Sequence, residues 1–145
     1  HHTYFVIWGI LTMAALSFGI ISAYRRLLKT KVYIPLLSIA GIGMLFTLCF
    51  DFDYDIKPDY YFHCVGSLTF SIVMGITIFL LFLLNWKKAN IYRLFTVLTC
   101  VILLADLALL LIFKETALIE VLPVFAGYIM LGITNLRSDR VEAYK

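Results

Sequence analysis

Five long apolar stretches alternate with short polar connections along the chain, and this pattern predicts five helices. The stretches cover residues 3–24, 32–50, 60–84, 91–113 and 116–136. Each is close to the roughly 17–25 residues that a helix needs to cross a bilayer. Short connections make consecutive helices antiparallel. The sequence therefore predicts an all-α integral membrane protein, in which residues 1–145 form a single up-and-down bundle of five transmembrane helices.

The basic residues lie in every second connection, which predicts an orientation in the membrane. Four follow the first stretch, three lie around the third connection and three follow the fifth stretch. Cytoplasmic loops are enriched in Lys and Arg, so these regions are expected inside, with the amino end outside and the carboxyl end cytoplasmic. We expect a multi-pass protein of the cell membrane. An outward amino end also suggests that a signal peptide or an additional span precedes residue 1.

The composition supports a membrane protein over a soluble one. Hydrophobic residues make up 63% of the chain and charged residues 14%, against about 25% charged residues in soluble domains. Lipid accepts apolar faces that a soluble core of this size could not bury. The net charge of +3 does not indicate nucleic acid, because the basic residues lie at span ends. The expected partners are the lipid bilayer and, as candidates, other membrane subunits or further copies of the chain.

An acidic connection between the second and third stretches is the densest polar feature. Asp51, Asp53 and Asp55 alternate there, and Asp59 follows. Hard cations prefer several oxygen ligands, so the alternating aspartates are candidate ligands for a divalent cation, the only cofactor that the sequence suggests. The segment lacks the glycine turn and the terminal glutamate of an EF-hand loop. The alternative is a solvated loop, with Asp59 stabilising the start of the third helix.

His63 is the candidate centre of a catalytic site. Asp59, His63 and Ser67 are spaced four residues apart and so share one helical face. Together with Asp106 they form the residue set of a nucleophilic or metal-assisted hydrolase, and His63 is also a candidate metal ligand with the aspartates. Helical spacing alone does not create the required hydrogen bond between nucleophile and base. The alternative is a histidine that anchors the membrane interface.

Asp106 lies inside an apolar stretch, about 10 Å of helix from its outer end. An unpaired carboxylate near a helix centre costs roughly 2.5–3.5 kcal/mol, so Asp106 is expected to face the bundle, to be protonated or to meet a partner. His63 is a candidate partner. The alternative is a packing hydrogen bond to a Ser, Thr or Tyr side chain.

Glu115 and Glu120 lie at the outer beginning of the fifth stretch. With Asp106 and the aspartates of the acidic connection, they predict an outward-facing acidic vestibule, which would attract cations or protons. Asp106, Glu120 and Glu115 are therefore the candidate pathway residues. The same separation of charge also arises from membrane topology alone.

The three cysteines do not form a CxxC motif. Cys49 and Cys64 both lie near outer span ends, where an oxidising compartment would let them form a disulfide across the acidic connection. Cys100 lies inside the fourth stretch and is expected to be a buried apolar filler.

Short motifs near the span ends carry a resemblance to a known family. They are Tyr24-Arg25-Arg26-Leu27, Phe62-His63, Gly127-Tyr128-Ile129-Met130 and Leu136-Arg137. This layout resembles a family of bacterial and archaeal multi-span membrane proteins of unknown function, similar in arrangement to DRAM-like proteins. Many members have a Phe-Pro-x-Asp motif where this chain reads Phe50-Asp51-Phe52-Asp53, and members usually have additional spans. The resemblance implies a membrane bundle and no established activity.

Three functions are consistent with these patterns. The first is a non-enzymatic accessory protein that binds lipid or a partner and has the acidic vestibule as its working surface. The second is a membrane-embedded, metal-dependent lipid hydrolase, which requires His63 and Asp106 to converge. The third is a cation or proton translocator, which requires a polar path continuing inward from Asp106.

Overall fold

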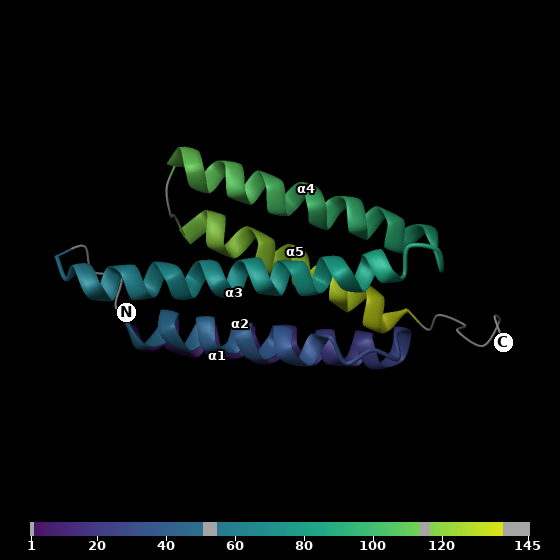
Figure 1. Ribbon diagram of the computed structural model, residues 1–145, viewed down its shortest axis with the longest axis horizontal. Helices are drawn as coiled ribbons and strands as arrows, with labels where there is room; N and C mark the ends of the chain where they lie inside the picture. Colours follow the sequence, from purple (N-terminus) through teal and green to yellow (C-terminus); the bar gives the residue numbers. More distant parts are fainter. Residues whose placement is uncertain (1, 51–54, 114–116, 138–145) are drawn as a thin grey trace.

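The computed structural model describes residues 2–50, 55–113 and 117–137, and these form five α-helices. None of these residues lies in a strand, so the all-α prediction is confirmed. Consecutive helices contact one another and run along the long axis of the molecule in alternating directions (Figure 1). The helices are α1 (His2–Leu27), α2 (Tyr33–Cys49), α3 (Lys57–Leu84), α4 (Asn90–Phe113) and α5 (Ala117–Leu136).

Two helices extend beyond the apolar stretches that predicted them. α1 continues past Tyr24 through Arg25 and Arg26 to Leu27. Arginine is a good helix former, and positive charge in a last turn interacts favourably with the helix dipole. α3 begins at Lys57 rather than at residue 60, because Pro58 is readily accommodated in a first turn, where its missing N–H has no helical partner.

Among the described residues, three helices are long and apolar enough to cross a membrane: α1 from Thr3 onward, α3 and α4. α2 has 17 residues, which is about 26 Å of helix. In α5, the segment Val121–Leu136 whose side chains the structure describes is also shorter. Large apolar side chains are exposed on the outside of the bundle, as at Phe18 (77%) and Leu111 (78%). Such surfaces suit lipid, whereas a water-soluble monomer rarely exposes extended apolar patches.

α2 and α3 approach so closely that their backbones touch. A Cβ atom on Gly66 would lie 2.6 Å from both the Gly43 carbonyl oxygen and the Thr47 amide nitrogen. A Cβ atom on Gly43 would in turn lie 2.8 Å from the Gly66 carbonyl oxygen and from the Phe70 amide nitrogen. Small residues allow this approach where burial from lipid supplies no drive for helix association. The α2–α3 pair is accordingly the most extensive contact in the bundle.

Polar contacts join α1 to α5 at the end of the bundle where both helices finish. The Arg26 guanidinium donates hydrogen bonds to the carbonyl oxygens of Thr134, Asn135 and Arg137, the last at 2.7 Å. In return the Asn135 side-chain amide donates to the Gly19 carbonyl oxygen at 3.0 Å. The last carbonyls of a helix have no partner within it, so Arg26 satisfies groups that α5 cannot satisfy alone.

Two further hydrogen bonds tie α1 to α3 and to the connection after α3. The buried Tyr24 hydroxyl donates to the Thr77 carbonyl oxygen at 2.8 Å. The Lys88 ammonium donates to the Leu27 carbonyl oxygen at the end of α1. Partial burial lowers the pKa of Lys88, because desolvation disfavours the charged form of an amine. Arg26 and Lys88 thus stabilise this end of the bundle by donating hydrogen bonds to carbonyl oxygens at the ends of α5 and α1.

Candidate functional site

The packing between α3 and α4 changes along their length. Near their connection, the Phe82 ring packs on Tyr92 and Phe95, with centroids 6.4 and 5.1 Å apart. The close contact continues to Gly75, where the Leu103 side chain packs directly on the glycine and an added Cβ atom would displace it. Beyond this point α4 diverges from α3, and the first half of α5 lies between them (Figure 1). The divergence leaves space beside the next turn of α4.

A cavity of about 210 Å³ occupies this space. α3, α4 and α5 line it, and Leu16 of α1 contributes to its base. Ile72 and Leu107 form its rim and are about half exposed, so the cavity opens on the apolar outer surface between α3 and α4. The floor consists of buried apolar side chains: Leu16, Phe70, Met74, Ile78 and Val124.

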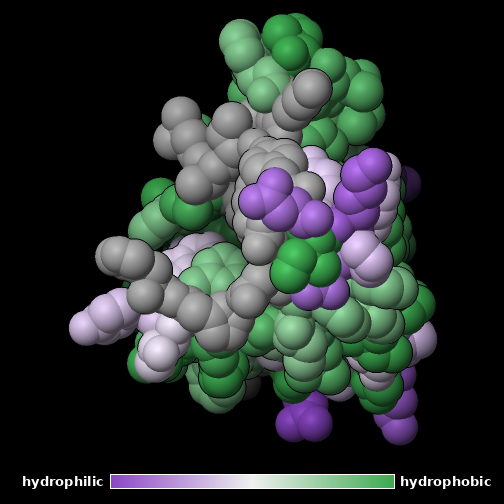
Figure 2. Space-filling view, turned by 90° about the vertical axis from the view of Figure 1, so that its left-hand side faces the viewer, coloured by the Kyte–Doolittle hydropathy of each residue, from purple (hydrophilic) through white to green (hydrophobic). Residues whose placement is uncertain are grey.

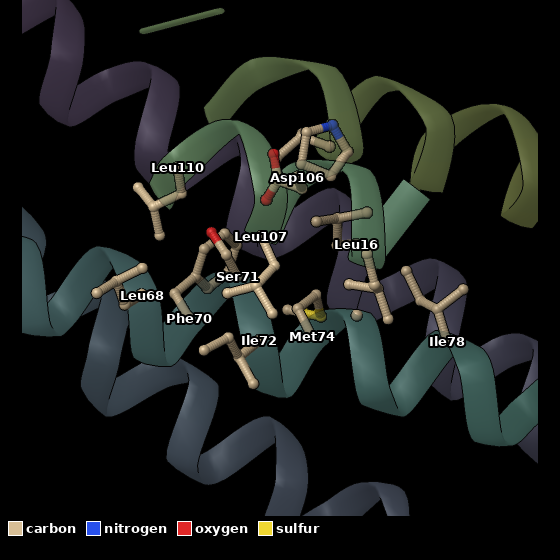
Figure 3. A pocket seen from close by; sticks show the side chains of 14 residues that line it. Leu16, Leu68, Phe70, Ser71, Ile72, Met74, Ile78, Asp106, Leu107 and Leu110 are labelled. Atoms are coloured by element: carbon tan, nitrogen blue, oxygen red, sulfur yellow. The ribbon is translucent and has the colours of Figure 1, made fainter. Parts of the chain in front are cut away.

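Two polar side chains, Asp106 and Ser71, lie among these apolar ones (Figure 3). Asp106 follows Leu103 by three residues on α4, and Ser71 precedes Gly75 by four on α3, so both lie about one turn beyond the close contact of these helices. Within the described residues, neither the Asp106 carboxyl nor the Ser71 hydroxyl has a hydrogen-bond partner. The cavity therefore combines an apolar floor with an unpaired acid and an unpaired hydroxyl.

His63 occupies a different part of the bundle. It is 5% exposed, and its Nδ1–H donates a hydrogen bond of 2.9 Å to the Phe50 carbonyl oxygen. Its ring stacks on Phe5 of α1 with centroids 5.7 Å apart. These contacts place His63 against α1 and the end of α2, whereas Asp106 lies against α3 and α5. Asp106 has no hydrogen-bond partner within the described segments, so the expected His63–Asp106 pair is not formed.

The other candidate residues of α3 do not line the cavity. Ser67 is 7% exposed, and Asp59 is half-buried in the first turn. Asp55 is exposed just before the helix. Across residues 2–50, 55–113 and 117–137, no three His, Cys, Asp or Glu side chains lie close enough to hold a metal ion. Figure 2 shows the end of the molecule at which α3 begins and α4 ends. Hydrophilic side chains gather there beside the apolar end of α4 at the top.

Several candidate residues fall outside what the structure describes. These are Asp51 and Asp53 of the acidic connection, Glu115, and the side chain of Glu120. The metal site and the acidic vestibule that depend on them stay predictions.

The structure answers the open question about the disulfide and corrects the expectation for Cys100. Cys49 and Cys64 are not joined in a disulfide. Cys100 is exposed on α4 and is not a buried filler, because its face of the helix points away from the neighbouring helices. A thiol on that face is accommodated because hydrocarbon, like a protein core, tolerates small apolar groups.

Sequence reasoning missed Ser71 and the cavity floor. Ser71 lies four residues after Ser67 and eight after His63, which is a visible polar stripe on α3. The spacing of these three residues does not show which of them lines a cavity with Asp106. The answer depends on where α4 diverges from α3, just beyond the contact between Gly75 and Leu103.

No family model, curated protein or solved structure matches the chain. The resemblance to the family of unknown function therefore stays a prediction, and function is argued from the site itself.

Proposed function

We propose that the protein is a small non-enzymatic membrane protein that holds a hydrocarbon chain of a lipid in the cavity between α3, α4 and α5. The cavity carries this proposal, because it joins a buried apolar floor to a rim on the lipid-facing surface. At about 210 Å³, it is smaller than the roughly 300–1,000 Å³ of sites that enclose a drug-sized ligand. It suits one chain rather than a complete lipid.

The contacts of His63 favour binding over hydrolysis. The proposed hydrolase needs His63 and Asp106 to act on one substrate. The Nδ1–H of His63 is committed to the Phe50 carbonyl oxygen, and the ring packs on Phe5. Asp106 lines a cavity whose other walls are almost wholly apolar. An apolar chain is the ligand that such walls accept at least cost.

If the cavity binds a hydrocarbon chain, a substitution that fills the cavity should reduce lipid binding. Ser71→Phe places a ring in the space, so each purified protein molecule should retain one phospholipid fewer in native mass spectrometry from a mild detergent. Ser38→Phe is the matched control, because Ser38 is exposed on α2 and bonds only to the Ile34 carbonyl oxygen. That variant should retain the wild-type number. Equal lipid retention by the two variants would refute the proposal.

The proposal includes five passes, with the amino end outside and the carboxyl end in the cytoplasm. It is supported by the length of α1, α3 and α4 and by the described basic residues, of which all but Lys57 lie at the end of the bundle where α1, α3 and α5 finish. The lengths of α2 and α5, 17 and 20 residues, fall within the roughly 17–25 that can span a bilayer.

Cysteine labelling in intact cells tests this orientation. In a background with the native cysteines replaced by serine, Lys57→Cys should react with an impermeant maleimide, because it lies at the outer end of α3. Lys87→Cys lies just after the other end of α3 and should react only after permeabilisation. Reversed labelling would refute the orientation, and equal labelling would show that α3 does not cross the membrane.

A further inference from the structure

The proposed lipid site contains a carboxyl group that no cation in the described part of the chain approaches. Lys57 is the only described Lys or Arg in the half of the bundle that holds Asp106, and it is exposed in the first turn of α3. The remaining described cations lie at the other end, where Arg26 and Lys88 cap helix ends. No described cation therefore neutralises Asp106, and a bound cationic molecule is a candidate to do so.

The cavity limits the chemistry of that molecule. Its apolar floor favours a hydrocarbon chain, and an ionisable group within a membrane helix is a functional site by default. The Asp106 carboxylate accepts hydrogen bonds but donates none, and the Ser71 hydroxyl can accept one as well. A primary ammonium group has three N–H donors. Its donors match the acceptors that Asp106 and Ser71 offer in the cavity, and the attached hydrocarbon chain matches the apolar floor.

We propose that the ligand of this cavity is a lipophilic primary amine, with its ammonium group between Asp106 and Ser71 and its hydrocarbon chain against Met74, Ile78 and Val124. This inference rests on the proposed function, since it names the chemical class of the chain that the cavity holds. It follows from the unpaired acid, the unpaired hydroxyl and the apolar floor lying in one cavity.

Binding of simple single-chain probes tests the proposal. The protein is placed in phosphatidylcholine nanodiscs, and native mass spectrometry measures bound dodecylamine, dodecanol and dodecyltrimethylammonium. We expect dodecylamine to bind at least tenfold more tightly than the other two, because dodecanol lacks the charge and the trimethylated ion lacks N–H donors. Dodecanol binding as tightly as dodecylamine would overturn the proposal.

Variants of the same size identify the groups responsible. Asp106→Asn should weaken dodecylamine binding at least tenfold and leave dodecanol binding unchanged. Ser71→Ala should weaken amine binding severalfold, because it removes one acceptor. Asp55→Asn, which changes an exposed carboxylate before α3, should bind dodecylamine as the wild type does. Wild-type affinity of Asp106→Asn for the amine would refute the assignment.

The two proposals fail in different ways. If Ser71→Phe loses its phospholipid but the wild type shows no preference for the amine, the cavity binds chains and only the amine assignment is wrong. If Ser71→Phe retains all its phospholipid, the chain site itself is wrong. If Asp106→Asn leaves amine binding unchanged but dissociates a complex with another membrane protein, Asp106 pairs with a cation of that protein and the amine proposal is overturned.

Discussion

Gly66→Ala is expected to lower the free energy of unfolding by about 3 kcal/mol, the upper part of the usual range for overpacking. The added Cβ atom would lie 2.6 Å from the Gly43 carbonyl oxygen and from the Thr47 amide nitrogen. Both are backbone atoms of α2, so no side-chain rotation relieves the collision and the two helices must separate. Loss of helical circular dichroism during an SDS titration in mixed micelles measures the change.

Gly132→Ala is the matched control for this substitution. Gly132 is also in a helix, and a Cβ atom added there meets nothing within 4 Å. Alanine is favoured over glycine in a helix by about 1 kcal/mol, so this variant should be as stable as the wild type or slightly more stable. Helix propensity would favour alanine at Gly66 too, so a loss there must come from the contact with α2. Equal stability of the two variants would show that the backbones do not meet at Gly66.

The positions of the five helices could be predicted from the sequence because each apolar stretch is long and bounded by polar residues. The ends of α1 and α3 were harder to predict. Arg25 and Arg26 look like the start of a polar connection, although arginine readily continues a helix. Pro58 looks like a helix breaker, although it is well suited to a first turn. A charged residue or a proline at the edge of an apolar stretch is therefore not by itself the end of a helix.

The candidate site was predictable only in part. Asp106 stands out in the sequence because nothing else near it is polar, and the structure places it in the cavity. Its neighbours could not be inferred from position along the bundle, because residues at the same level of a helical bundle can point to different helices. His63 contacts Phe5 and Phe50, whereas Ser71 of the same helix lines the cavity together with Asp106. A single sequence does not show which helix faces meet.

Arg26→Gln is expected to cost about 3 kcal/mol of unfolding free energy and to loosen the end of α5. The wild-type guanidinium bonds three carbonyl oxygens, those of Thr134, Asn135 and Arg137. A hydrogen bond to a charged group contributes about 1.5–3 kcal/mol, and the three bonds of one side chain are not additive. Glutamine is shorter and neutral, so it leaves most of these carbonyls without a partner and removes the favourable charge at the helix end.

Arg25→Gln separates this local effect from a general effect of charge. Arg25 is exposed one residue earlier on α1, so its replacement removes the same charge from the same end of the bundle and should change stability by no more than about 0.5 kcal/mol. Hydrogen exchange adds spatial resolution: in Arg26→Gln, amides near residues 131–137 should exchange faster, while amides around Gly43 and Gly66 should keep their protection. If exchange accelerates equally in all helices, Arg26 stabilises the bundle as a whole. If Arg26→Gln matches Arg25→Gln in both measurements, the contacts with α5 contribute nothing.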